Sequence, residues 1–96
     1  MSANYPFNPK YGSGQTFNST GTSASTTIGK GNKQLMIANV GSNVAYVRVG
    51  ASSVSATNSD CPVLPGTFIV LTKFEDNDVL DHISATGTTL SVNPGS

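Results

Sequence analysis

The segment Asp81-His82-Ile83-Ser84 contains the three residue types of a hydrolytic triad, in which a histidine activates a serine. In a strand, however, Asp81 and His82 project to opposite faces. His82 and Ser84 share a face but stand about 6.8 Å apart, given a rise of ~3.4 Å per residue. A nucleophile and its general base need a separation of roughly 2.6–3.2 Å. We therefore predict no catalytic residues here and interpret His82 as an ordinary strand residue.

Acidic residues cluster between positions 75 and 81 and could supply oxygen ligands to calcium; they are Glu75, Asp76, Asp78 and Asp81. A helix–loop–helix calcium loop also needs a glycine and a later glutamate at fixed spacing, and neither is present. The simplest interpretation is a solvated turn between strands. A looser calcium site at a sheet edge stays open as an alternative, and our prediction is that the chain has no metal site.

The remaining chemical features of the sequence are weak. The glycine-rich segment 29–32 lacks the G-x-x-x-x-G-K-[ST] pattern of a phosphate loop. Cys61 is the only cysteine, and with no partner for a disulfide or metal site it is interpreted as a small buried side chain. We therefore predict no cofactor and a protein that is not an enzyme.

Composition indicates one folded domain with a modest core. The chain has 96 residues, of which 36% are hydrophobic and only 10% are charged, against about 25% charged in an ordinary domain. Zero net charge together with clustered apolar residues argues against disorder. The five basic residues are scattered, which predicts no binding to nucleic acid. No apolar run approaches the ~20 residues that cross a bilayer, so no membrane association is expected.

The charges are unevenly distributed along the chain. Residues 1–59 carry four basic side chains and no acid, whereas residues 60–96 carry one lysine and all five acids. This division is either chance or the mark of a two-signed surface that contacts further copies or a charged neighbour. The first residues lack the basic and apolar regions of a signal peptide, so we expect synthesis and assembly in a reducing cytoplasm.

From residue 14 onward the pattern alternates between strands and turns. The clearest strand is 44–49, where Ala45, Val47 and Val49 share one face. The turn 41–43 predicts a hairpin with the preceding strand. The other expected strands are 15–17, 24–28, 34–40, a short one near Val54, 67–73, and a final pair, 79–86 and 88–93, with Ile83, Ala85, Leu90 and Val92 pointing inward. About seven strands without a helix predict an all-β fold, a single small antiparallel β-sandwich of jelly-roll or Ig-like type.

Residues 1–13 differ from the rest of the chain, because aromatic side chains alternate there with prolines that favour extended backbone. We interpret them as an extended N-terminal arm that precedes a β-sandwich domain of residues 14–96. Aromatic rings bury large apolar areas, so the arm is expected to dock on a neighbouring subunit. A floppy terminus is the alternative. The expected contact residues are Tyr5, Pro6, Phe7, Pro9 and Tyr11.

Three motifs follow one another in the second part of the chain. Residues 39–50 read N-x-G-x-N-x-x-Y-V-R-x-G, residues 62–66 read P-x-L-P-G, and residues 85–95 read A-T-G-x-x-L-x-V-x-P-G. In this order they resemble short β-sandwich proteins encoded in the structural gene clusters of tailed bacteriophages. The match covers roughly residues 37–95 and leaves residues 1–30 uncovered.

This resemblance implies a virion component, most specifically a head decoration (cement) protein that binds the outside of a phage capsid and stabilises it. The expected partners are the major capsid protein or another virion protein and further copies of the chain, with a trimer favoured because capsids present local three-fold positions. Two alternatives stay open. One is a tail, neck or baseplate component. The other is a carbohydrate-binding or adhesin-like module, although such modules usually stack sugars on aromatic rings and the chain has no tryptophan.

Overall fold

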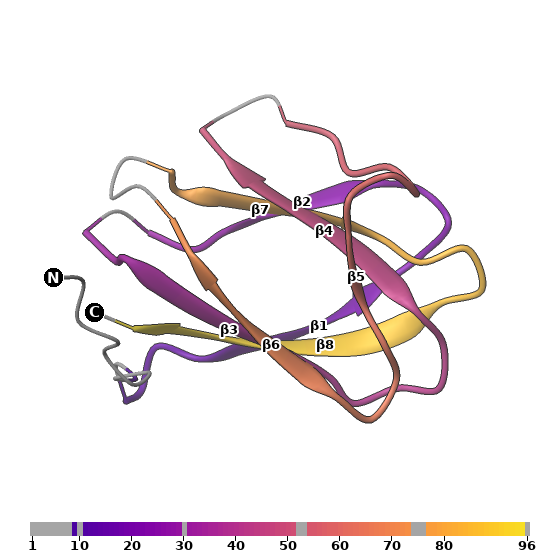
Figure 1. Ribbon diagram of the computed structural model, residues 1–96, viewed down its shortest axis with the longest axis horizontal. Helices are drawn as coiled ribbons and strands as arrows, with labels where there is room; N and C mark the ends of the chain where they lie inside the picture. The colour runs from indigo at the N-terminus through magenta and orange to yellow at the C-terminus, as the bar shows by residue number, and fades with distance from the viewer. Residues whose placement is uncertain (1–8, 10, 30, 52–53, 74–76, 96) are drawn as a thin grey trace, which may run out of the picture.

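The computed structural model describes residues 9, 11–29, 31–51, 54–73 and 77–95. These residues form an all-β domain of two four-stranded antiparallel sheets, a β-sandwich of eight strands (Figure 1). The strands are β1 (Gln15–Ser19), β2 (Ala24–Thr27), β3 (Gln34–Asn39), β4 (Ala45–Gly50), β5 (Cys61–Val63), β6 (Phe68–Thr72), β7 (Val79–Ile83) and β8 (Thr88–Gly95). The described residues include no helix that is long and apolar enough to cross a membrane.

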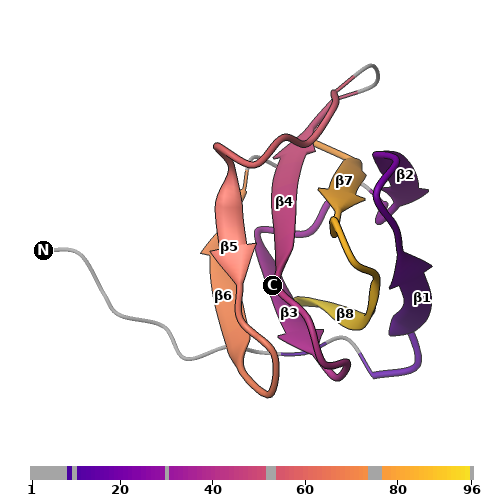
Figure 2. The ribbon, with the colours of Figure 1, turned by 90° about the vertical axis from the view of Figure 1, so that its right-hand side faces the viewer.

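The connectivity of the strands is that of a jelly roll. One sheet has the order β1-β8-β3-β6 and the other the order β2-β7-β4-β5. Successive strands change sheet at every connection except the one from β4 to β5. Figure 2 shows the sheets facing each other, with β5 and β6 at one side and β2 and β1 at the other. The predicted β-sandwich is therefore confirmed, and of its two predicted types the strand order matches the jelly roll.

The core lies between the sheets and follows from the period-2 alternation of the strands. In β4, Ala45 and Val47 are buried while Arg48 is exposed, as the alternation predicts. The buried apolar side chains are Ile28, Leu35, Ile37, Ala45, Val47, Val63, Leu80, Leu90 and Val92. Half-buried Phe17, Val49, Ile69 and Leu71 pack against them.

Both hairpins expected from the sequence are wrong. The loop 41–43 joins β3 to β4, and these strands lie in different sheets. The last two strands, β7 and β8, also belong to opposite sheets, so they are not paired with each other. Glycine and asparagine specify that the chain reverses, but the sheet that the next strand joins is decided by packing across the core.

Three local expectations between residues 51 and 63 are also wrong. No strand forms at Val54, whereas β5 forms around Pro62, where the sequence indicated only a break. A proline is tolerated there because β5 is an edge strand, with only β4 as its neighbour. Cys61 is exposed rather than buried, although it lies on the same face of β5 as buried Val63, at the first residue of this short edge strand.

The inward face of β7 differs from the expected one. Leu90 and Val92 point into the core as predicted, but Ile83 is only half-buried and Ala85 is exposed. The alternating residues that face the core here are Leu80, His82 and Ser84, while Asp81 is buried on the other face. The apolar pattern predicted the wrong face because two of these three inward side chains are polar. Their polar atoms form hydrogen bonds inside the domain.

Candidate functional site

A serine and a histidine do meet inside the sandwich. The Nδ1 atom of His82 in β7 lies 3.0 Å from the Oγ atom of Ser19 in β1, so the hydrogen bond joins the two sheets. The ring of Phe17 stacks on His82 with centroids 4.4 Å apart. Sequence reasoning tested only the nearby Ser84 and missed Ser19, which lies 63 residues before His82. No local spacing could have signalled this contact.

The geometry of this pair supports a structural role. Ser19 and His82 are 0% and 2% exposed, so a substrate has no access to the hydroxyl. Asp81 points to the other face of β7, where its carboxylate accepts hydrogen bonds from the Ser25 hydroxyl (2.6 Å) and the Ala56 backbone N–H (2.7 Å). Asp81 thereby fastens the loop after β4 to the outside of its sheet and does not orient the imidazole.

Burial lowers the pKa of His82 below its ordinary value of 6.5, and the charge of Asp81 offsets this only in part. As pH falls through 6.5, the unfolded chain takes up a proton that folded His82 resists. The contribution of neutral His82 to the free energy of unfolding is therefore fully present above pH 6.5 and declines below it. We expect the melting temperature measured by circular dichroism to fall as pH is lowered from about 7 toward 5.

The matched variant for this prediction is His82→Gln, which keeps a hydrogen-bonding side chain but cannot titrate. His82 is the only histidine, so no other imidazole contributes in this window. The variant should start from a lower melting temperature and change little between pH 7 and 5. An equal pH dependence in both proteins would contradict the prediction.

Asn39 organises the end of the sandwich where the connections 41–43 and 84–87 meet. Its buried amide nitrogen donates to the carbonyl oxygens of Asn43 (2.7 Å) and Val63 (2.9 Å). Its oxygen accepts from the Gly41 N–H (3.1 Å) and the Thr88 hydroxyl (2.7 Å). One side chain thus uses its full hydrogen-bonding capacity to join both sheets and the loop between them.

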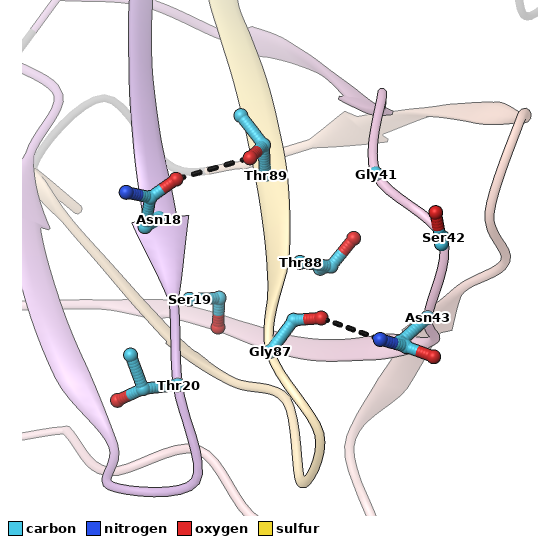
Figure 3. A pocket seen from close by; sticks show the side chains of 9 residues that line it. All are labelled: Asn18, Ser19, Thr20, Gly41, Ser42, Asn43, Gly87, Thr88 and Thr89. Atoms are coloured by element: carbon cyan, nitrogen blue, oxygen red, sulfur yellow. Dashed lines mark hydrogen bonds between the residues drawn. The ribbon is translucent and has the colours of Figure 1, made fainter.

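A hollow of about 420 Å³, lined by serine, threonine, asparagine and glycine residues, lies at this end of the molecule (Figure 3). Asn43 donates to the Gly87 carbonyl across it (2.7 Å), and Thr89 donates to Asn18 on its other side (3.0 Å). The lining residues are Asn18, Ser19, Thr20, Gly41, Ser42, Asn43, Gly87, Thr88 and Thr89. None of them is a carboxylate, a histidine or an aromatic residue. The hollow therefore lacks a general acid or base and a platform on which a sugar could stack.

No group of three or more histidine, cysteine or acidic side chains comes together within the described residues. Glu75 and Asp76, two members of the acidic cluster, lie outside those residues. Arg48 and Asp60 form an ion pair at 2.8 Å, in which the arginine side chain is exposed and the aspartate side chain is half-buried. The amide of Thr57 and the guanidinium of Arg48 lower the pKa of Asp60.

The predicted contact residues of the arm are only partly described. Tyr5, Pro6 and Phe7 lie outside the described residues. Pro9 is half-buried and forms a β-bridge with Gly95, so the base of the arm is attached to the end of β8. Tyr11 is 92% exposed, which leaves its ring available to a partner.

A second apolar surface, not predicted from the sequence, covers the outer side of β3 and β6. Phe68 and Val70 are 63% and 43% exposed. In the strand register Phe68 lies opposite Ala38 and Val70 lies opposite Met36, so their side chains form one patch. Val40 continues this row and is also exposed. We call these five residues the apolar face.

The alternation in residues 68–71 could have revealed the apolar face. Both faces of β6 are apolar, and Ile69 and Leu71 already account for the one that packs on the core. A strand at the edge of a sheet with a second apolar row either lies under another element or exposes that row.

A scan against protein-family models and a search of curated protein sequences found no match for the chain.

Proposed function

We propose that the chain is a structural protein of a tailed-phage particle, a decoration protein that binds the outer surface of the head and stabilises it. The apolar face is the observation that carries the proposal. Contiguous exposed apolar patches on small domains mark sites where another protein binds. The ring of Tyr11, at the base of the arm, is a further exposed apolar group.

The resemblance to phage virion proteins directs the proposal to a virus particle. Several motif residues have a defined part in the jelly roll, including Asn39 at the sandwich end and Arg48 in its ion pair. Jelly rolls are frequent among viral capsid proteins, but lectins and cupins share the architecture. The fold therefore supports the proposal without choosing between head and tail.

Three copies would suit a capsid surface. A capsid presents repeated local three-fold and pseudo-three-fold positions, which a trimer matches with one set of contacts per subunit. Once one arm binds, the effective concentration of the other two rises, so weak individual contacts add up to stable attachment.

The test of location is imaging of particles made with and without the gene for this chain. Under the proposal, negative-stain images show extra density on the head, and heads that lack the protein lose integrity more easily on heating. Density on the tail, neck or baseplate would favour that alternative. Particles of unchanged composition would contradict a virion role altogether.

Deletion of residues 1–13 should separate binding from folding. The truncated domain keeps all eight strands and, among the pairings of the described residues, loses the bridge between Pro9 and Gly95, so its melting temperature should change little. It should fail to co-sediment with particles that lack the protein, because the aromatic side chains of the arm are gone.

Deletion of residues 1–8 alone is the matched control, since it keeps Pro9 and Tyr11. If the protein without residues 1–8 binds particles with intermediate affinity, both residues 1–8 and residues 9–13 contribute to binding. Full binding by the longer deletion would contradict the arm hypothesis and leave the domain surface as the contact. Co-sedimentation at increasing salt concentration then distinguishes two kinds of contact. Binding through exposed charges weakens as ionic strength rises, whereas binding through the apolar face does not.

A further inference from the structure

The outer edge of β6 presents unused backbone hydrogen-bonding groups. At one end of the strand Lys73 N–H donates to Lys33, and at the other end Asn39 N–H donates to Thr67. Because bonding alternates along an antiparallel ladder, odd-numbered residues of β6 bond to β3. The N–H and C=O groups of Phe68, Val70 and Thr72 therefore point away from the sheet. Within the described parts of the chain they have no backbone partner.

This edge differs from the other three sheet edges in the described residues. The edge strand β5 has three residues and includes Pro62, and β2 has four residues with polar side chains at three of them. In β1 the exposed side chains are polar. By contrast, β6 reads Phe-Ile-Val-Leu-Thr, without charge or proline. Natural proteins rarely leave such an edge open, because it pairs readily with other chains.

We propose that β6 pairs edge to edge with β6 of a second copy of this chain, in antiparallel orientation and centred on Val70. In this register Val70 faces Val70, and Phe68 faces Thr72 of the second copy. Phe68, Val70 and Thr72 of one copy, whose N–H and C=O groups point away from the sheet, then lie opposite the same three residues of the other copy. The two sheets join into one of eight strands, and the two apolar faces become continuous across a two-fold axis.

Charge favours a second copy over a charged partner. The outward positions of β3 are Gln34, Met36 and Ala38, and those of β8 are Thr89, Ser91 and Asn93. With the outward residues of β6 they form a surface without a charged side chain, so two copies approach without like-charge repulsion. Lys73, beyond the strand end, lies opposite Thr67 of the second copy and not opposite its own counterpart.

The two-fold contact is independent of the proposed phage role and of the arm. Where a three-fold contact through the arm also forms, the two contacts together give six copies. Light scattering coupled to size exclusion, over a dilution series, measures the mass directly. At the concentrated end, a mass of two or six copies of the 9.8 kDa chain supports the proposal. A mass of one or three copies overturns it.

Substitution of Val70 tests the register. Because Val70 faces itself, Val70→Lys and Val70→Glu each place like charges opposite one another, and each should halve the mass. An equal mixture of the two variants should restore it, since lysine then faces glutamate. Unchanged mass in either variant alone, or a mixture that stays dissociated, overturns the pairing centred on Val70.

The control is Thr27→Lys, which places the same charge on the exposed edge of β2 and should keep the mass of the unmodified protein. Val70 is partly exposed and points away from the core, so its variants should melt close to the unmodified protein. Equal loss of mass in Thr27→Lys would also overturn the proposal, because the effect would then be a general one of added charge.

Discussion

Val47→Arg is expected to abolish folding. Val47 is 1% exposed in β4 and packs in the core between the sheets. A buried charge without a partner costs about 3–5 kcal/mol, and the packing of the valine is lost as well. Domains of this kind have a total stability of about 5–15 kcal/mol, with small ones near the lower end. Circular dichroism should show an unfolded chain, or one that melts near room temperature.

Ser91→Arg is the matched control, since it introduces the same side chain on the outward face of β8. Ser91 lies between buried Leu90 and Val92 in sequence but is half-buried on the opposite, outward face, from which a long guanidinium side chain can reach solvent. Its melting temperature should stay within a few degrees of that of the unmodified protein. Similar behaviour of the two variants would mean that the assignment of inward and outward faces is wrong.

Asn39→Asp should produce the second largest loss of stability. The substitution keeps the size and the two acceptors but removes both donated hydrogen bonds, which leaves the carbonyl oxygens of Asn43 and Val63 without that partner. Each buried polar group left unsatisfied costs about 1–3 kcal/mol. The melting temperature should fall by roughly 10–20 °C, given about 4–8 °C per kcal/mol in a domain of this size.

Asn18→Asp provides the same chemical change at a residue that lines the hollow at this end of the sandwich. The Asn18 side chain is exposed and accepts a hydrogen bond from Thr89, which a carboxylate also accepts. Its melting temperature should change by only a few degrees. If Asn39→Asp proves equally mild, the four hydrogen bonds of Asn39 do not hold the sandwich end together.

The β-sandwich was predictable because its signal is local. Alternation in 44–49 placed Val47 inside and Arg48 outside, and frequent turn residues left no room for helices. The partners of each strand were not predictable in the same way. After β3, the chain can form its next strand in the same sheet or in the opposite one. Which of the two occurs depends on which apolar faces meet, and that is a property of the whole chain.

The polar interior was also beyond sequence reasoning. His82 and Ser84 interrupt the apolar alternation of β7, so the pattern favoured Ile83 as the inward residue. Their burial is possible because Ser19 bonds to His82 and because the Ser84 hydroxyl donates to the Val44 carbonyl at 2.7 Å. Both partners are distant in sequence, so no window of neighbouring residues contains the information.

Several residues of the three motifs prove to be architectural. A side chain at Gly41 would collide with Thr88 and the Thr89 backbone, and Gly66 and Gly87 have positive φ angles of 75° and 88°. Asn39 and Asn43 fasten the same end of the sandwich. The motifs thus specify how the jelly roll is closed. Under the proposed function, the protein binds its partner through surfaces outside these glycines and asparagines, chiefly the apolar face and the arm.

The position of β8 determines when the domain can fold during synthesis. This strand is last of the eight along the chain, yet it lies between β1 and β3 and pairs with both. While the ribosome is still making residues 88–95, β1 has no neighbour in its sheet and β3 has only β6. At about 5–20 residues per second, the early strands wait for several seconds with apolar faces uncovered. Chaperones that bind nascent chains can therefore act before β8 emerges. A truncation that removes β8 should leave both β1 and β3 without this neighbour.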